Sequence, residues 1–142
     1  MRKPIRGAIV ALLLLTTLFA STASGFLSDL DGHWAAAVVT ALEMRGLVHG
    51  DGSGNYLPEQ PLTRAQMAKL LAIGLGYEAE AEALTKTPSR FADVSDGHWG
   101  RGYIELVAEL GIAEGYPDGR FGPDDPISRA EMATFIIRAA GL

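Results

Sequence analysis

The stretch Leu62-Thr63-Arg64-Ala65-Gln66-Met67-Ala68 occurs twice in the chain, the second time as Ile127-Ser128-Arg129-Ala130-Glu131-Met132-Ala133. In both copies a hydroxyl residue is followed three positions later by Gln66 or Glu131, and then by an apolar run. This order is the capping-box pattern, in which the two side chains satisfy free backbone N–H groups. A helix is therefore predicted to begin at each copy.

Each predicted helix carries an arginine in its first turn, Arg64 in one and Arg129 in the other. The helix dipole is positive there and favours an acidic residue by about 0.3–1 kcal/mol. One explanation is that each arginine binds an anion beside the free N–H groups of its helix. The other is that each arginine pairs with a nearby Asp or Glu. These residues alone leave both explanations open.

The two copies belong to a longer repeat. Shifting the sequence by 65 positions aligns residues 26–77 with residues 91–142 without a gap. The aligned residues that are identical include Phe26/Phe91, Asp31/Asp96, Gly32/Gly97, His33/His98, Trp34/Trp99, Gly46/Gly111, Gly50/Gly115, Gly54/Gly119, Pro58/Pro123, Pro61/Pro126, Arg64/Arg129, Ala65/Ala130, Met67/Met132, Ala68/Ala133 and Gly76/Gly141. An internal repeat of this kind determines the architecture.

Each repeat reads as helix, loop and helix. The first helix has apolar residues at helical spacing and ends at Gly46 or Gly111. Asp118-Gly119 predicts a tight turn or short hairpin in the loop. The expected core positions are Trp34, Val38, Ala41, Leu42, Met67, Leu70, Leu71 and Leu75 in the first repeat, and Trp99, Tyr103, Leu106, Val107, Leu110, Met132, Phe135, Ile136 and Ala139 in the second.

Four segments are predicted: a signal peptide at 1–25, a repeat at 26–77, a linker at 78–90 that begins as a helix, and a repeat at 91–142. The N-terminus is basic, then apolar from Ala8 to Ala20, then rich in small residues, so we expect export and cleavage between Ala20 and Phe26. A membrane association is expected only through this segment, because its apolar run is short for a span.

Composition limits the possible partners. Cleavage before Ser24 removes three basic residues, leaving nine basic and 17 acidic residues and a formal charge of −8. A nucleic-acid partner is therefore not expected, because phosphate binding needs a basic face. The chain has no cysteine, which excludes disulfides and a lipid-modified cysteine. About 119 residues would remain, enough for one domain.

The residues quoted so far carry a family resemblance. The second repeat contains F-A-D-V-S-D-G-H-W from Phe91, G-I-A-E-G-Y-P-D-G-R-F-G-P from Gly111 and I-S-R-A-E-M-A from Ile127. The first contains F-L-S-D-L-D-G-H-W from Phe26, G-L-V-H-G from Gly46 and L-T-R-A-Q-M-A from Leu62. Both repeats resemble the S-layer homology (SLH) motif. The resemblance implies a mainly α fold of tandem helix-loop-helix repeats with short hairpin-like loops, packed as an SLH-type bundle.

The resemblance also implies a function. SLH modules are non-catalytic and bind exported proteins to the cell wall through pyruvylated secondary cell-wall polysaccharide or peptidoglycan-linked polymer. Their motif arginine lies in the ligand groove and maps to Arg64 and Arg129, where a guanidinium would grip the carboxylate of a pyruvyl ketal. The sequence departs from the family in Gln66 for Glu, Ser128 for Thr, and two motifs where three are common.

The tryptophans, the histidines and the loop at 51–55 are further candidate binding residues. Trp34 and Trp99 could stack on a sugar, but a Trp at the head of an apolar helical stripe is more often part of a core. His33 and His98 lack partners at metal-ligand spacing and are expected at the surface or in a cap. The segment 51–55 resembles a calcium loop, but Tyr56 replaces the required Gly, which excludes an EF-hand. The candidate ligand-binding residues are Arg64, Arg129, Trp34, Trp99, Thr63, Ser128, Gln66 and Glu131.

No set of residues outside the repeat marks a catalytic pair, a metal site or a cofactor, so an enzyme is not expected. The predicted partner is cell-wall polysaccharide or peptidoglycan, in the cell wall, the S-layer or the medium. The alternative is a structural envelope subunit that assembles through its repeats without binding glycan. We also expect self-association, with itself or other SLH proteins, because two motifs leave an apolar flank uncovered.

Overall fold

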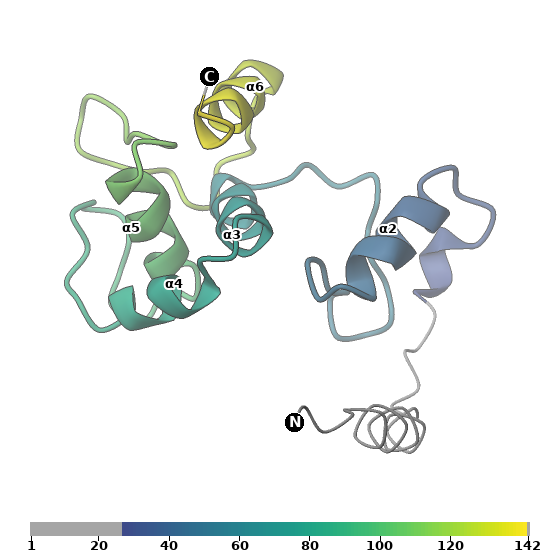
Figure 1. Ribbon diagram of the computed structural model, residues 1–142. Coiled ribbons are helices and arrows are strands. Elements are labelled where there is room, and N and C mark those ends of the chain that lie inside the picture. The colour runs from purple at the N-terminus through teal and green to yellow at the C-terminus, as the bar shows by residue number, and fades with distance from the viewer. Residues whose placement is uncertain (1–26, 142) are drawn as a thin grey trace, which may run out of the picture.

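The computed structural model describes residues 27–141 and shows a helical protein (Figure 1). The elements are η1 (Ser28–Leu30), α2 (Ala36–Glu43), α3 (Arg64–Gly74), α4 (Glu78–Leu84), α5 (Arg101–Glu109) and α6 (Arg129–Ala139). The described residues contain no strand, only an isolated antiparallel bridge between Thr63 and Pro126. The predicted mainly α fold is confirmed. The predicted signal peptide lies outside the described residues, within which no helix is long and apolar enough to cross a membrane.

The two predicted helix starts are both capped as expected. Thr63 Oγ1 accepts from the Gln66 N–H at 3.2 Å, and Gln66 Oε1 accepts from the Thr63 N–H at 2.9 Å. Ser128 and Glu131 make the same two bonds, at 3.2 and 2.9 Å. These caps satisfy N–H groups that the first turn leaves free, and so place the start of α3 and α6 at equivalent positions.

The first helix of each repeat ends as predicted. Gly46 and Gly111 have φ values of 69° and 68°, the left-handed conformation that glycine adopts without a steric penalty. The following loop turns at Asp118-Gly119, where the Tyr116 N–H donates to Arg120 O at 2.6 Å and the Gly119 N–H to Tyr116 O at 3.0 Å. This is the tight turn that the sequence predicts.

The apolar side chains form two main cores. The larger joins both repeats: Ala65, Met67 and Ala68 of α3 pack with Ile104 and Val107 of α5, together with Val94, Ile112, Ala113, Phe121 and Phe135. The smaller lies within the first repeat and contains Leu27, Leu30, Val39 and Val48. Figure 1 shows the consequence, since α2 and its loops lie beside the cluster of α3, α4, α5 and α6.

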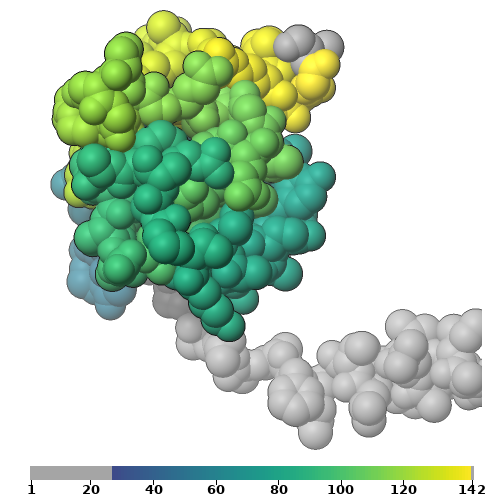
Figure 2. Space-filling view, turned by 90° about the vertical axis from the view of Figure 1, so that its left-hand side faces the viewer, coloured from purple at the N-terminus to yellow at the C-terminus, as the bar shows by residue number. Residues whose placement is uncertain are grey.

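The predicted linker packs against the second repeat. Its first part is α4, and Figure 2 shows the teal surface of this segment next to the green surface of α5. Ala81 of α4 is fully buried in a small cluster with Leu106 of α5. Its end is held by Glu105 of α5, whose carboxylate accepts from Ser89 Oγ at 2.6 Å and Arg90 Nε at 2.7 Å. Burial acts to raise the pKa of Glu105, but these hydrogen bonds outweigh it and the pKa is lowered. The linker is thus a structural layer of the fold.

Several expected core positions are exposed instead. Val38, Leu75, Leu110 and Ile136 are 61%, 41%, 44% and 48% exposed. Helical spacing identifies an apolar stripe, but burial also requires a neighbour, and in the described residues no element covers these four side chains. The prediction that these four residues belong to the core is wrong, because periodicity does not reveal which side of a helix is covered by another element.

Candidate functional site

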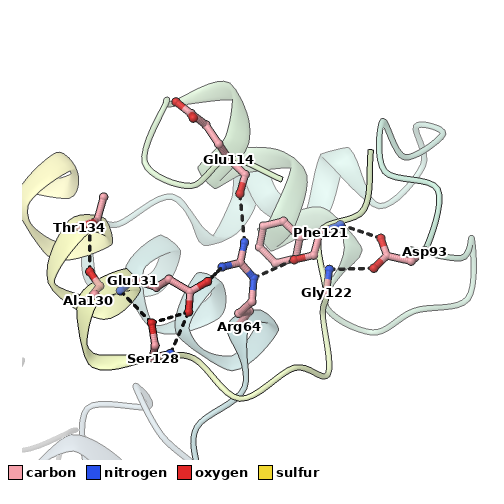
Figure 3. Close-up of polar contacts among 9 residues, drawn as sticks. All are labelled: Arg64, Asp93, Glu114, Phe121, Gly122, Ser128, Ala130, Glu131 and Thr134. Atoms are coloured by element: carbon pink, nitrogen blue, oxygen red, sulfur yellow. Dashed lines mark hydrogen bonds and ion pairs between the residues drawn. The ribbon is translucent and has the colours of Figure 1, made fainter. Parts of the chain in front are cut away.

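Arg64 begins α3 and lies almost wholly inside the protein, with 2% of its surface exposed (Figure 3). Its guanidinium donates to Phe121 O at 2.7 Å through Nε and to Glu114 O at 3.0 Å through Nη2, and Nη1 pairs with Glu131. All three partners belong to the second repeat. Of the two explanations left open for a first-turn arginine, Arg64 shows the pairing with an acidic residue, and the docking of α3 on the second repeat encloses it.

Three aromatic rings surround the same guanidinium. Its Cζ atom lies 4.7 Å from the ring centre of Tyr116, 4.8 Å from that of Phe121 and 5.4 Å from that of Phe135. Such contacts stabilise a buried cation because the faces of the rings are negative. Arg64 therefore joins the two repeats by charge, hydrogen bonds and packing together.

Glu131 has two roles in this site. One carboxylate oxygen accepts from the Ser128 N–H and Ser128 Oγ, at 2.9 and 2.6 Å, while the other oxygen pairs with Arg64. The Ser128 side chain and backbone bonds hold the pKa of Glu131 below its usual value; partial burial opposes them, and the charge of Arg64 lowers the pKa further. The capping box of α6 is thus also the anionic side of the Arg64 site.

Beside this site lies a shallow depression of about 260 Å³, here called the second-repeat hollow. Its lining residues are Arg64, Glu114, Gly115, Tyr116, Ala130, Glu131, Thr134, Phe135 and Arg138. Arg138 is part-exposed and lies 3.4 Å from a carboxylate oxygen of Glu114. The exposed guanidinium of Arg138, a hydroxyl and a half-buried phenol ring therefore line one depression, and the buried guanidinium of Arg64 lies at its base.

The backbone of the α3 start is also fixed on the second repeat. The Arg64 N–H donates to Asp125 O and the Ala65 N–H to Pro123 O, both at 3.0 Å, and the Ile127 N–H donates to Leu62 O at 2.9 Å. The first N–H groups of a helix lack partners within it, so these carbonyls complete the helix start. The loop of the second repeat is thus a fitted acceptor for the helix start of the first.

Arg129 occupies the equivalent place on α6 but a different environment. Its side chain is exposed, as are Ser128 and Ala130. The structure therefore does not bring Arg129 together with Arg64, although the two are identical in sequence context. The difference follows from position in the chain, because the face of α6 that corresponds to the docked face of α3 meets no further repeat in the described residues.

A larger depression of about 610 Å³ lies on the first repeat and is here called the first-repeat cavity. Thr63, Gln66 and Lys69 of α3 line one side, the loop from Leu47 to Leu62 supplies most of the rest, and Trp99 of the second repeat reaches its edge. Of the candidate ligand-binding residues, the structure thus collects Thr63, Gln66 and Trp99 at this cavity, and Arg64 and Glu131 at the second-repeat hollow.

The two tryptophans are exposed, Trp34 by 87% and Trp99 by 52%, so the expectation that they belong to the core is wrong. The histidines before them are half-buried and bond the backbone of the turn that leads into each helix, whose N-caps are Ala35 and Gly100. Nδ1 of His33 accepts from the Ala35 N–H at 3.1 Å, and Nδ1 of His98 accepts from the Gly100 N–H at 3.0 Å. The ring centres of each histidine and the neighbouring tryptophan lie 5.5 and 5.6 Å apart.

The loop at Asp51 uses its carboxylate internally. Asp51 accepts from the Ser53 N–H at 2.8 Å and the Asn55 N–H at 3.2 Å, and the hydrogen bonds from Ser53 are the main reason that the pKa of Asp51 is lowered. Within the described residues, no three His, Asp or Glu side chains form a group that could hold a metal ion.

Sequence reasoning did not select Tyr116, Thr134 or Arg138. Tyr116 lies in the loop motif and Arg138 in the last turn of α6, a position where a cation is expected merely to complement the helix dipole. Tyr116 lies in the loop that receives Arg64, and Thr134 and Arg138 lie on the helix that follows it. Their spacing along the chain gives no sign that the three side chains line one hollow. Their meeting is a consequence of tertiary packing.

Comparison with known proteins agrees with this structure. The family model of the S-layer homology domain matches residues 27–68 and 90–133. Relatives include a cell surface protein of Thermoanaerobacter kivui, 32% identical over 98% of this chain and 19% of that protein. A cellulosome-anchoring protein of Acetivibrio thermocellus is 33% identical over 77% of this chain and 24% of its own length. An S-layer protein of Bacillus licheniformis is 36% identical over 76% of this chain and 12% of its own length.

The chain spans less than a quarter of the length of these relatives. The two matched segments nevertheless cover more than half of the chain and contain both helix starts and both loops of the sites described above. On this evidence the protein belongs to the S-layer homology domain family.

Proposed function

We propose that the protein is a non-catalytic module of the cell envelope that binds an anionic, pyruvylated cell-wall polysaccharide and so anchors itself or a partner to the wall. Its relatives are named as cell-surface, S-layer and anchoring proteins. The N-terminal pattern and this kinship support export to the cell surface. The proposed binding site for the polymer is the second-repeat hollow.

The meeting of Arg64, Arg138 and Tyr116 in one open hollow carries the proposal. The chain has a formal net charge of −5, so an anionic polymer is not attracted by the protein as a whole and needs a local cationic site. The ring of Tyr116 adds to the positive character of the hollow, because the guanidinium carbons of Arg64 and Arg120 lie 4.7 and 5.7 Å from its centre. A guanidinium binds a carboxylate with two parallel hydrogen bonds.

Arg64 and Arg138 have different parts in this proposal. Three hydrogen bonds occupy three of the five N–H donors that an arginine has, so Arg64 supplies mainly a fixed positive charge at the base of the hollow. Within residues 27–141, the ion pair of Arg138 is with the exposed carboxylate of Glu114, at 3.4 Å, and its part-exposed guanidinium can turn toward a ligand. Thr134 adds a hydroxyl at the rim.

Arg138→Ala tests the proposal, because it removes the accessible guanidinium without touching the buried Arg64 site. Binding of the exported protein to purified cell wall should fall about tenfold, the value of one charge-assisted contact. Arg138→Lys should retain part of the binding, since lysine keeps the charge but loses the planar fork. Wild type should bind weakly to wall from which the pyruvyl groups have been removed. This binding should be as weak as that of Arg138→Ala to wall that keeps its pyruvyl groups.

Arg45→Ala is the matched control, because Arg45 is an exposed arginine of the first repeat, outside both depressions, that donates to Ala41 O. It should bind wall like wild type. Circular dichroism verifies that each variant is folded. Equal binding by folded Arg138→Ala and wild type would show that the hollow is not the polymer site.

A further inference from the structure

The contact between the two repeats provides a reference with which the equivalent surface of α6 can be compared. Ala65 and Ala68, on the face of α3 that meets the second repeat, have no exposed surface. The equivalent residues of α6, Ala130 and Ala133, are exposed, as is Arg129, the equivalent of Arg64. α6 therefore presents, uncovered, the residue types that α3 buries, after the same capping box.

The first-repeat cavity is the matching acceptor. Shifted by 65 positions, the partners of Arg64 and Ala65 in the second repeat become residues that line this cavity. Phe121, Glu114 and Glu131 correspond to Tyr56, His49 and Gln66; Pro123 and Asp125 correspond to Pro58 and Gln60. The cavity is thus the place where a helix start would dock if a further repeat preceded the first.

The loop of the first repeat is held by an aspartate in the same way as the loop of the second repeat. Asp93 fixes the second-repeat loop by accepting from the Phe121 and Gly122 N–H groups at 2.8 and 2.7 Å. Asp29 fixes the first-repeat loop by accepting from the Tyr56 and Leu57 N–H groups at 2.8 and 2.7 Å. Leu57 and Gly122 occupy equivalent positions, and both have a positive φ, 62° and 70°. The same backbone shape is therefore held in both loops, although no helix start fills the first.

We propose that a second copy of this chain inserts the start of its α6 into the first-repeat cavity. In this contact the Arg129 and Ala130 N–H groups donate to the carbonyls of Gln60 and Pro58, and the Arg129 guanidinium donates to the carbonyl of Tyr56. The donor surface is the start of α6 and the acceptor surface is the first-repeat cavity, and the described residues of each copy carry one of each. Such a head-to-tail contact produces closed rings or open chains of copies.

The cavity differs from its reference in ways that weaken the contact. Gln66 replaces the carboxylate of Glu131, and Leu70 and Asp51 replace the rings of Phe135 and Tyr116. Asp51 keeps a negative charge at the cavity, but the three aromatic contacts of Arg64 are reduced to one, at Tyr56. The contact between copies is therefore expected to be reversible, whereas the contact within the chain is part of the fold.

Docking would also complete a second hollow. Arg129 would lie beside Asp51, Gln66 and Lys69 as Arg64 lies beside Tyr116, Glu131 and Thr134. This consequence rests on the proposed polymer binding and gives Arg129 a part in it. The association itself does not depend on the polymer, so each can fail without the other.

Sedimentation of the exported protein between about 1 and 100 μM tests the association. Wild type should form species larger than a monomer as concentration rises. Ala133→Glu, which places a charge on the exposed α6 face, should remain monomeric. Gln66→Glu, which restores the carboxylate found at Glu131, should lower the dissociation constant about tenfold. Ala83→Glu, at an exposed alanine of α4, is the matched control and should behave like wild type.

Cross-linking tests the register. A Cβ at Gly100 would lie 3.2 Å from the Ala65 Cβ, and the equivalent pair is Ala35 and Ala130. Because the chain has no cysteine, Ala35→Cys and a mass-tagged Ala130→Cys can be mixed and oxidised; disulfides need Cβ atoms about 3.5–4.5 Å apart. The mixed disulfide should form far faster than either symmetric one.

A monomeric wild type at 100 μM would overturn the proposal, as would an Ala133→Glu variant that still associates. So would a mixed disulfide that forms no faster than the symmetric ones. If the protein is monomeric and Lys69→Ala loses wall binding, the first-repeat cavity is instead a polymer site. Loss of wall binding by Arg138→Ala, with association unchanged, would separate the two proposals.

Discussion

At the scale of single residues, Arg64 and Arg129 show how far identical sequence can differ in environment. Both follow a capped hydroxyl residue and precede Ala, but Arg64 is buried under three aromatic rings and Arg129 is exposed. A surface arginine adds little to stability. When a buried arginine is removed, its hydrogen-bond acceptors stay buried without a partner, which costs stability.

Arg64→Ala is therefore expected to lower the free energy of unfolding by about 3 kcal/mol, because it leaves the carbonyls of Phe121 and Glu114 without their donor and breaks the pair with Glu131. Arg129→Ala should change it by less than about 0.5 kcal/mol. Urea unfolding followed by circular dichroism measures both. Similar losses for the two variants would contradict the difference in burial.

Glu131 should make stability depend on pH. Its pKa is lowered in the folded state, so its contribution is complete above the pKa of the unfolded chain, near 4.5, and is lost as pH falls through the folded value. Glu131→Gln should destabilise the protein at pH 7, and the gap to wild type should narrow between about pH 5 and pH 3. Denaturant unfolding across this range gives the gap; a constant gap would show that Glu131 does not titrate with folding. Glu80→Gln, at an exposed site on α4, controls for the lost charge.

At the scale of elements, the contact between α4 and α5 distinguishes the repeats. A Cβ at Gly102 would lie 2.0 Å from the carbonyl oxygen of Ala81, so the two helices can approach only because α5 has glycine there. The first repeat has Ala37 at the equivalent position, and this alanine is exposed. Gly102 lies in the first turn of α5, and the absence of a side chain there is explained by the acidic linker, which folds back against this turn.

Gly102→Ala should lower the free energy of unfolding by about 1–3 kcal/mol, because overpacking forces α4 away from α5 despite the better helix propensity of alanine. The reverse change at the equivalent site, Ala37→Gly, should cost about 1 kcal/mol through propensity alone. Thermal unfolding compares them, with near-ultraviolet circular dichroism of Tyr103 and its surroundings reporting the packing. A more stable Gly102→Ala variant would mean that α4 is not held against α5.

At the scale of the whole molecule, stability is unevenly distributed. The core that joins α3, α5 and α6 contains residues with no exposed surface, among them Ile104, Val107 and Phe121. The core around α2 is smaller, and Trp34, Val38 and Met44 on or beside α2 are 87%, 61% and 81% exposed. The segment around α2 is consequently the part most easily opened, whereas α3 of the same repeat belongs to the larger core.

Amide hydrogen exchange should therefore be faster in α2 than in α5, because local opening of α2 exposes less apolar surface. Mass-spectrometric exchange on the exported protein measures this. If copies associate through the first-repeat cavity, protection of the loop 47–62 should increase with protein concentration, while that of α5 stays constant. Equal protection of α2 and α5 would show that the two cores unfold together.

The sequence by itself determined the local structure of this protein. The duplicated capping boxes, Gly46 and Gly111 at the helix ends, and the repeat offset predict the helices of both repeats, because caps, turns and periodicity depend on residues close together in the chain. The family followed from the same motifs. The helical start of the linker was also readable, but not its packing on α5.

Only the tertiary structure decided which face each helix covers. It buried Arg64 and left Arg129 free, exposed both tryptophans and four apolar stripe positions, and brought Tyr116 and Arg138 together beside Arg64. The physical reason is that burial depends on which element lies opposite, and the two repeats, alike in sequence, have different neighbours: the second receives the helix start of the first, while the first receives none from the described chain.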